Sequence, residues 1–492
     1  MGAATSSELH PIYHPPENMG NITIRNLTIT PLELKEAERL VKPADPGNTG
    51  PGGLAKITAR ITGRGHTPLE PTAAAQPENA VSAKQQITGV LLQPFSECPT
   101  SVPAPDPSTS EQLRLTFEEP GTGHLYVAEF PDSSPQSLVM RHATADPTGK
   151  EFTIIYLPRA CYLAIFSSAN LPAWMSSLPD SLPLSALSIP GTHNSPTHYT
   201  ALPTVRCQAV SVRAQLANGI RFLDIRVSCD PNSSDLALVH SAFPISLSGT
   251  KYFHDLLATV YAFLDENPSE TILMSIKREG TGKGSDQLLS QYLADRYFGG
   301  DDTRRWYTAP RIPSLGEARG RVVLLRRFHL DDSLRDAGLG IDGSVWPDNC
   351  ADGTCGSGQI RIQDFYEVGQ TEDIDKKIEL ARAELERAGQ QACVAAGEFG
   401  AAGGALPLFI NFLSASSFFN ASCWPDRIAA KINPSIIEYL STGHGAPGKG
   451  PGQLTIGDSG TGVVVTDWVG HDGDWDIVRC IVGWNSRLQL KA

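Results

Sequence analysis

The stretch IPGTHNS at residues 189–195 decides the fold prediction for this chain. It ends a hydrophobic run at a Pro-Gly step and presents His193 directly afterwards. Further along, GIRFLDIR at 219–226 repeats this layout with Asp224 and Arg226, and DLALVH at 235–240 ends in His240. In a parallel barrel the C-terminal ends of the strands surround the active site, so we expect these side chains to converge there.

From about residue 172, strand-like and helix-like segments alternate, which predicts a TIM-like (β/α)8 barrel over 172–492, with departures from the regular form. The predicted strands are 184–190, 220–227, 235–240, 270–277, 321–327, 359–364, 407–413 and 462–467. The predicted helices are 211–218, 250–266, 284–298, 371–390 and 426–440, the fourth beginning at Thr371. A Gly/Pro-rich stretch at 442–456 is expected to be a loop before the last strand.

The N-terminal third has a different pattern. Residues 1–20 are expected to be disordered, and 21–170 to form an all-β, sandwich-like accessory domain with a mobile loop at about 43–78. Only 31–41 resembles a helix in this region. Its expected strands lie within 22–34, 56–62, 86–92, 113–117, 125–130 and 152–157. The chain is therefore predicted to be multidomain.

Composition limits the choice of partners and compartment. The chain has 492 residues and a formal net charge of −13, which excludes a nucleic-acid partner because no basic stripe could neutralise phosphates. Nine widely spaced cysteines favour free thiols in a reducing compartment. No apolar run is long enough to span a membrane. We expect a cytoplasmic protein, at most peripheral at membranes; the N-terminal MGAATS is compatible with myristoylation.

Two histidines and an arginine at strand ends are the groups needed to cleave a phosphodiester without a metal. One histidine removes a proton, the other supplies one, and the guanidinium holds the phosphate. We therefore expect no cofactor and no metal.

A series of motifs extends this reading. In order they are IPGTHNS, QLANGIRFLDIR, LALVH, NPSETILMSIKRE, GEARGRVVLLRRF, VWPDN, IQDFY, INF, KINP and VVVTDW. They resemble the phosphatidylinositol-specific phospholipase C X-domain superfamily, and most closely its metal-independent, bacterial-type branch. The resemblance covers roughly 180–470 and leaves the N-terminal third unmatched.

The resemblance implies a role for each matching residue. His193 is the general base for the inositol 2-hydroxyl, oriented by Asp467, and His240 is the general acid for the diacylglycerol oxygen. Arg226 holds the phosphate and Asp224 orients it. The residues that would line the inositol pocket are Lys277, Glu279, Arg327, Asp364 and Tyr366.

Asn194 departs from the bacterial pattern, which has an aspartate paired with the general acid. It matches a calcium-dependent branch instead, but Arg226 and Lys277 stand where that branch needs carboxylates, and hard cations require oxygen ligands. We therefore keep the metal-independent reading and expect Asn194 to lower the pKa of His240.

The expected partner is a phosphatidylinositol-type lipid at a membrane interface, with Phe418, Phe419 and Trp424 on the pocket rim suited to insertion. Core packing of these aromatic residues is an equal alternative. Two other functions remain open: a related barrel phosphodiesterase for another head group, and a weakly catalytic inositol-lipid-binding protein. The predicted products of the leading function are diacylglycerol and inositol 1,2-cyclic phosphate.

Overall fold

The computed structural model describes residues 20–41, 81–106, 111–130, 137–143, 149–336, 338–391, 406–446 and 460–489. Several sequence predictions lie outside these ranges: the disordered N-terminus before residue 20, its acylation pattern, the loop at 43–78 with the strand at 56–62, and residues 447–456 of the predicted Gly/Pro-rich loop at 442–456.

A parallel sheet forms the centre of the C-terminal part, in the order β17-β15-β12-β11-β22-β21-β20. These strands are β11 Ile189–Thr192, β12 Phe222–Ser228, β15 Ile272–Arg278, β17 Val322–Arg327, β20 Ile360–Gln363, β21 Leu408–Phe412 and β22 Val463–Thr466. The short strands β16 Trp306–Tyr307 and β18 Ile341–Asp342 pair with β17, and β19 Gly353–Cys355 pairs antiparallel with β20. The sheet curls into an incomplete barrel, because within the described residues no strand pair joins its two edges.

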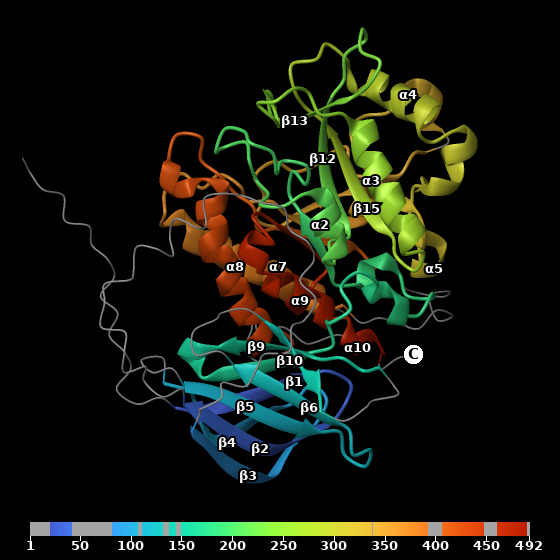
Figure 1. Cartoon of the computed structure of the whole chain (residues 1–492). Helices are drawn as coiled ribbons and strands as arrows, with labels where there is room; N and C mark the ends of the chain where they lie inside the picture. Colours follow the sequence, from blue (N-terminus) through green and yellow to red (C-terminus); the bar gives the residue numbers. More distant parts are fainter. Residues whose placement is uncertain are drawn as a thin grey trace, which may run out of the picture.

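Helices surround this sheet (Figure 1). They are α2 Val212–Ala217, α3 Phe253–Glu266, α4 Asp286–Arg296, α5 Leu315–Ala318, α6 Asp332–Arg335, α7 Asp373–Gly389, α8 Pro425–Thr442, α9 Asp476–Gly483 and α10 Ser486–Gln489. Each predicted helix in this part has its counterpart, although α7 begins at Asp373 and not at Thr371. None of the described helices is both long enough and apolar enough to cross a membrane.

One predicted barrel strand was wrong. Residues 235–240 contain β13 Ala237–His240, which runs antiparallel to the end of β12 and pairs with β14 Phe243–Pro244. This hairpin branches away from the parallel sheet. Alternation of apolar and polar residues predicts a strand but does not state its direction or its partner, so the sequence could not make the distinction.

The N-terminal strands form two five-stranded sheets with an apolar core between them. One has the order β4-β1-β10-β9-β7 and the other β3-β2-β5-β6-β8. The strands are β1 Asn21–Leu27, β2 Leu32–Val41, β3 Val81–Leu92, β4 Glu97–Pro103, β5 Glu111–Glu118, β6 Leu125–Phe130, β7 Leu138–Val139, β8 Arg141–His142, β9 Thr153–Leu157 and β10 Tyr162–Phe166. The suggested helix at 31–41 was wrong: β2 pairs along its length with β3 and β5.

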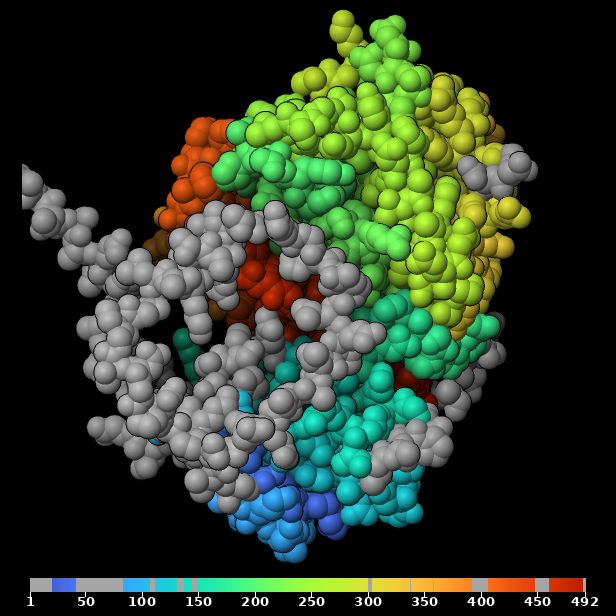
Figure 2. All heavy atoms as spheres, in the orientation of Figure 1, coloured from blue at the N-terminus to red at the C-terminus, as the bar shows by residue number. Residues whose placement is uncertain are grey.

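The first of these sheets also packs against the barrel. Every residue of β10 is buried, and α8 and α9 contact this strand. A Cβ on Gly483 of α9 would lie 2.4 Å from Phe166, so only glycine allows this close approach. Arg25 donates to the carbonyl oxygens of Ser441 at 3.1 Å and His444 at 2.8 Å. Figure 2 shows the N-terminal strands, in blue and cyan, at the base of the molecule below the green and yellow barrel residues.

Candidate active site

The IPGTHNS stretch places His193 at the C-terminal end of β11. A Cβ on Gly191 would lie 2.8 Å from the Phe222 Cβ, so glycine lets β11 and β12 pack closely. Asn194 adopts the left-handed conformation, with φ at 43°, and this turns the chain immediately after His193. The Ser195 backbone N–H then donates to the Asp224 carbonyl at 3.0 Å, which ties the turn to β12.

Three cations lie side by side across neighbouring strands. In the parallel register Arg226 of β12 faces Lys277 of β15, and Lys277 faces Arg327 of β17. Residues at one level of a parallel sheet point to the same side, so the three side chains reach the same cavity. The sequence predicted each residue but not this alignment.

Carboxylates balance this row of cations. Arg226 donates through Nε and Nη2 to Asp224, at 3.1 and 2.9 Å, and also contacts Glu279. Glu279 Oε1 lies 2.9 Å from Lys277 Nζ. Burial alone would raise the pKa of Asp224, but Arg226 and Arg327 outweigh it and lower that pKa to about 2. Asp224 is therefore ionised and can orient Arg226.

His193 is paired with Asp467, the residue directly after β22. The two groups are 3.0 Å apart, from Nδ1 to Oδ1. Because the carboxylate only accepts, Nδ1 carries a proton, and Nε2 has the free lone pair when the ring is neutral. Burial opposes the charged ring, yet Asp467 and Cys207 keep the pKa of His193 well above its usual value.

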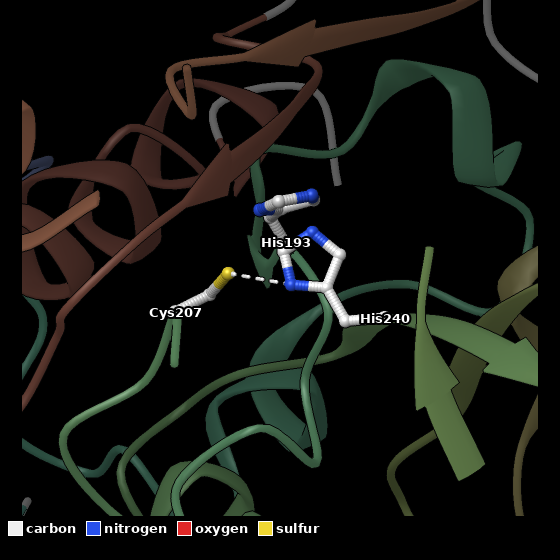
Figure 3. Close-up of side chains that lie close together, drawn as sticks. All are labelled: His193, Cys207 and His240. Carbon is white, nitrogen blue, oxygen red and sulfur yellow. Dashed lines mark hydrogen bonds between the residues drawn. The ribbon is translucent and has the colours of Figure 1, made fainter. Parts of the chain in front are cut away.

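His240 ends β13, and its ring lies close to that of His193. The ring centroids are 5.8 Å apart and the planes are nearly perpendicular. His240 Nδ1 lies 2.9 Å from the Val205 carbonyl oxygen and 3.7 Å from Cys207 Sγ (Figure 3). Burial alone would lower the pKa of His240, but Cys207 outweighs it and the pKa is raised.

The expected neighbour of Asn194 was therefore wrong. Its side-chain Nδ2 lies 3.0 Å from His193 Nε2 and so contacts the proposed base, not the proposed acid. The reason is that the left-handed turn at 194 directs this side chain back over its own neighbour, which the sequence alone did not reveal. The pKa of His240 is raised above that of a free imidazole by Cys207.

These residues border one cavity of about 420 Å³. Most of the predicted site residues line it: His193, Arg226, His240, Lys277, Glu279, Arg327, Asp364 and Tyr366. Three further predicted residues lie behind this lining. Asp224 contacts Arg226, and Asn194 and Asp467 contact His193. The structure thus brings the whole predicted set together.

Sequence reasoning assigned no role to several residues of the wall. Trp346 packs against Arg327, whose guanidinium carbon is 3.8 Å from the ring centroid, and donates to Asp364 at 2.9 Å. Asp348 accepts from the Tyr366 hydroxyl at 2.7 Å. The VWPDN motif contains both residues and could have indicated them. No motif marks Cys207.

Ser241 turns the chain directly after His240. It has a positive φ of 53°, the region that glycine occupies without strain, and its N–H donates to Glu279 at 2.9 Å.

The sequence of this part is similar to a known family. Residues 181–328 match the model of the phosphatidylinositol-specific phospholipase C X domain. The chain is 34% identical over 177 residues to a 1-phosphatidylinositol phosphodiesterase of Listeria monocytogenes, and spans 51% of its length. It is 26% identical over 330 residues to a protein of the same name from Staphylococcus aureus, covering 63% of this chain and 93% of that protein.

A solved structure agrees on the fold of the X-domain part. A phosphatidylinositol-specific phospholipase C from Staphylococcus aureus carrying pentafluoro-Phe superposes with a TM-score of 0.51 at 24% identity. It covers 64% of this chain and 98% of its own. The family model and the two relatives confirm the predicted resemblance and agree with the predicted enzyme class of phospholipase C-like phosphodiesterases, and the solved structure shows the fold alone.

Proposed function

We propose that this protein cleaves phosphatidylinositol, or a glycosylated derivative, by intramolecular attack of the inositol 2-hydroxyl. The observation that carries the proposal is the convergence of His193, His240 and Arg226 on one cavity of about 420 Å³. The names of the Listeria and Staphylococcus relatives support the same substrate.

The bond changes follow from the orientation of the two rings. His193 Nε2 takes the 2-hydroxyl proton, and that oxygen forms a bond to phosphorus while the bond from phosphorus to the diacylglycerol oxygen breaks. His240, protonated, gives its proton to the departing oxygen. Arg226 neutralises the charge that develops on the phosphoryl oxygens. The products are diacylglycerol and inositol 1,2-cyclic phosphate, whose slower hydrolysis would reuse the same pair.

The far wall of the cavity suits a polyhydroxylated ring. Lys277 and Arg327 can donate to hydroxyl oxygens, Asp364 can accept from them, and Tyr366 offers an aromatic face for the ring carbons. Glu279 and Asp364 would repel phosphates added to the inositol. Unphosphorylated phosphatidylinositol is therefore the favoured substrate.

No metal takes part in the proposed reaction. A calcium ion beside the phosphate would have to share the space with Arg226 and Lys277, whose charges oppose it. Turnover should therefore survive a strong chelator.

Two aromatic residues beside the cavity could contact a lipid surface. Phe418 and Phe419 are 55% and 95% exposed and follow Ser416, which lines the cavity. Trp424, the third predicted rim residue, is half-buried where α8 begins, so we leave it out of the insertion surface. A cytoplasmic location with peripheral membrane contact remains part of this proposal.

The decisive experiment uses phosphatidylinositol vesicles in excess EDTA, with soluble phosphorus followed by NMR. We expect a cyclic inositol phosphate signal that is absent with His193→Ala. Activity that returns only with calcium would contradict the metal-free mechanism. No product under either condition would contradict the proposed substrate.

Membrane contact is tested separately with Phe418→Ser/Phe419→Ser. Weaker binding to phosphatidylinositol vesicles is expected, because two exposed rings no longer enter the interface. Leu91→Ser is the matched control, since Leu91 is a 45% exposed hydrophobic residue on β3 of the N-terminal sheets. Equal loss in both variants would contradict a specific insertion surface.

A further inference from the structure

Cys207 lies beside both proposed catalytic histidines and has no role in the proposed reaction. It is fully buried, and its Sγ points at the His240 ring, with the His193 ring next to it (Figure 3). Cys207 Sγ and one nitrogen from each of the two imidazoles all lie within 4.8 Å of one another. In the described part of the chain, no other three His, Cys, Asp or Glu residues form such a group.

This set of donor atoms is selective in its chemistry. Thiolate and imidazole suit Zn²⁺ and similar thiophilic cations, whereas Mg²⁺ and Ca²⁺ require oxygen ligands. In a tetrahedral zinc site, with bonds of about 2.0 to 2.3 Å, the ligand atoms are roughly 3.5 Å apart. The three side chains would need to move inward by only about 1 Å.

The surroundings complete such a site. Asp467 holds His193 Nδ1 at 3.0 Å, which is the carboxylate–histidine arrangement that orients zinc ligands. The adjoining cavity supplies water for a fourth position. The cations that oppose calcium in the phosphate region are engaged with Asp224 and Glu279, and none of them belongs to this group of three.

We propose that His193, Cys207 and His240 form a binding site for a thiophilic divalent cation such as Zn²⁺, and that the occupied enzyme is inactive. On binding, the Cys207 thiol releases its proton to solvent and each ring binds through a neutral nitrogen. With an ion on one nitrogen of each ring, neither ring can form the imidazolium that the proposed proton transfers require. Only this inhibition rests on the proposed function; the binding site does not.

Binding is tested on EDTA-treated, dialysed full-length protein. Titration with Co²⁺ should produce a thiolate-to-cobalt charge-transfer band, and calorimetry should give one Zn²⁺ per chain. Cys207→Ser should lose the band and bind Zn²⁺ at least about tenfold more weakly, since even the loss of a supporting residue costs about 10- to 100-fold. Cys229→Ser, which removes another buried thiol, is the control and should behave as wild type.

A band or a zinc affinity unchanged in Cys207→Ser would overturn the site. Should that variant be unstable by circular dichroism, His240→Gln provides the same test, because it removes a second ligand and should weaken Zn²⁺ binding similarly. Retained affinity in His240→Gln would also overturn it.

The activity measurement separates the two proposals. We expect micromolar Zn²⁺, but not Mg²⁺ or Ca²⁺, to inhibit phosphatidylinositol cleavage, with recovery on adding EDTA. Zinc binding without any cleavage in zinc-free protein would keep the site and reject the proposed function. If cleavage persists in EDTA and Zn²⁺ does not inhibit it, the proposed function stands and the inhibitory site is rejected.

Discussion

The two histidines of the cavity are held in different ways. His193 follows β11 and is bound by Asp467, which follows the adjacent parallel strand β22. His240 lies on the β13–β14 hairpin outside the parallel sheet, and its neighbours are a backbone carbonyl and the Cys207 thiol. His193 is thus oriented by the buried Asp467 carboxylate. His240 is oriented by the dipole of the Val205 carbonyl and by the Cys207 thiol.

This difference suits the two proposed tasks. A carboxylate fixes the tautomer of a base and stabilises the imidazolium that forms when it takes a proton. A carbonyl oxygen orients an acid equally well without adding a full negative charge beside the departing oxygen. Loss of Asp467, the partner of His193, should therefore lower kcat strongly. Loss of Cys207, beside His240, should lower it weakly.

The largest expected effect comes from removing each ring. His193→Ala and His240→Ala should each lower kcat for phosphatidylinositol by about 10²- to 10⁴-fold, the range for general acid–base catalysis. With a substrate whose leaving group is a nitrophenol, His240→Ala should recover most of its activity, because this leaving group departs without a proton. His193→Ala should not recover. Equal recovery of both variants would contradict the assigned roles.

Asp467→Asn should have the next largest effect, lowering kcat by at least about 10²-fold because the ring loses its orientation and charge partner. Asp467 raises the pKa of His193, so the asparagine variant should have a lower pKa there. The base would then be deprotonated at lower pH, and the acidic limb of the pH–rate profile should move to lower pH. An acidic limb at the wild-type position would assign that limb to another group.

Asn194→Asp is expected to act in the opposite direction. It places a carboxylate beside His193 Nε2, where the amide now lies at 3.0 Å, and a nearby opposite charge raises a histidine pKa by about one unit or more. The acidic limb should move to higher pH, with the basic limb unchanged. A shift of the basic limb instead would place residue 194 beside His240 in solution.

Cys207→Ala should have the smallest effect of the series. Cys207 raises the pKa of His240, so the alanine variant should lose its acid form at lower pH. The basic limb should move to lower pH while kcat at the optimum changes by less than about tenfold, because the Val205 carbonyl still orients the ring. A loss as large as that of Asp467→Asn would show that the two sides do not differ.

The parallel strands of the barrel, its main helices and the residues of the site could be predicted from the amino-acid sequence, although β11 begins at Ile189 and not at 184. The prediction was possible because apolar runs ending in polar residues mark strand ends, and the ends of parallel strands meet at one face. The motifs within 181–328, which match the X-domain model, carried the same information. The N-terminal strand β10, all of whose residues are buried, was missed.

Three features could be found only from the folded structure. They are the direction of β13, the alignment of Arg226 with Lys277 and Arg327, and the neighbour of Asn194. These features depend on pairing register and on one positive φ, which leave no periodic signal in the chain. The position of Cys207 is the clearest case. It reaches the two histidines because the loop after β11 returns to the strand ends, where the Trp468 backbone N–H donates to the Cys207 carbonyl at 2.8 Å, a long-range contact that no local pattern encodes.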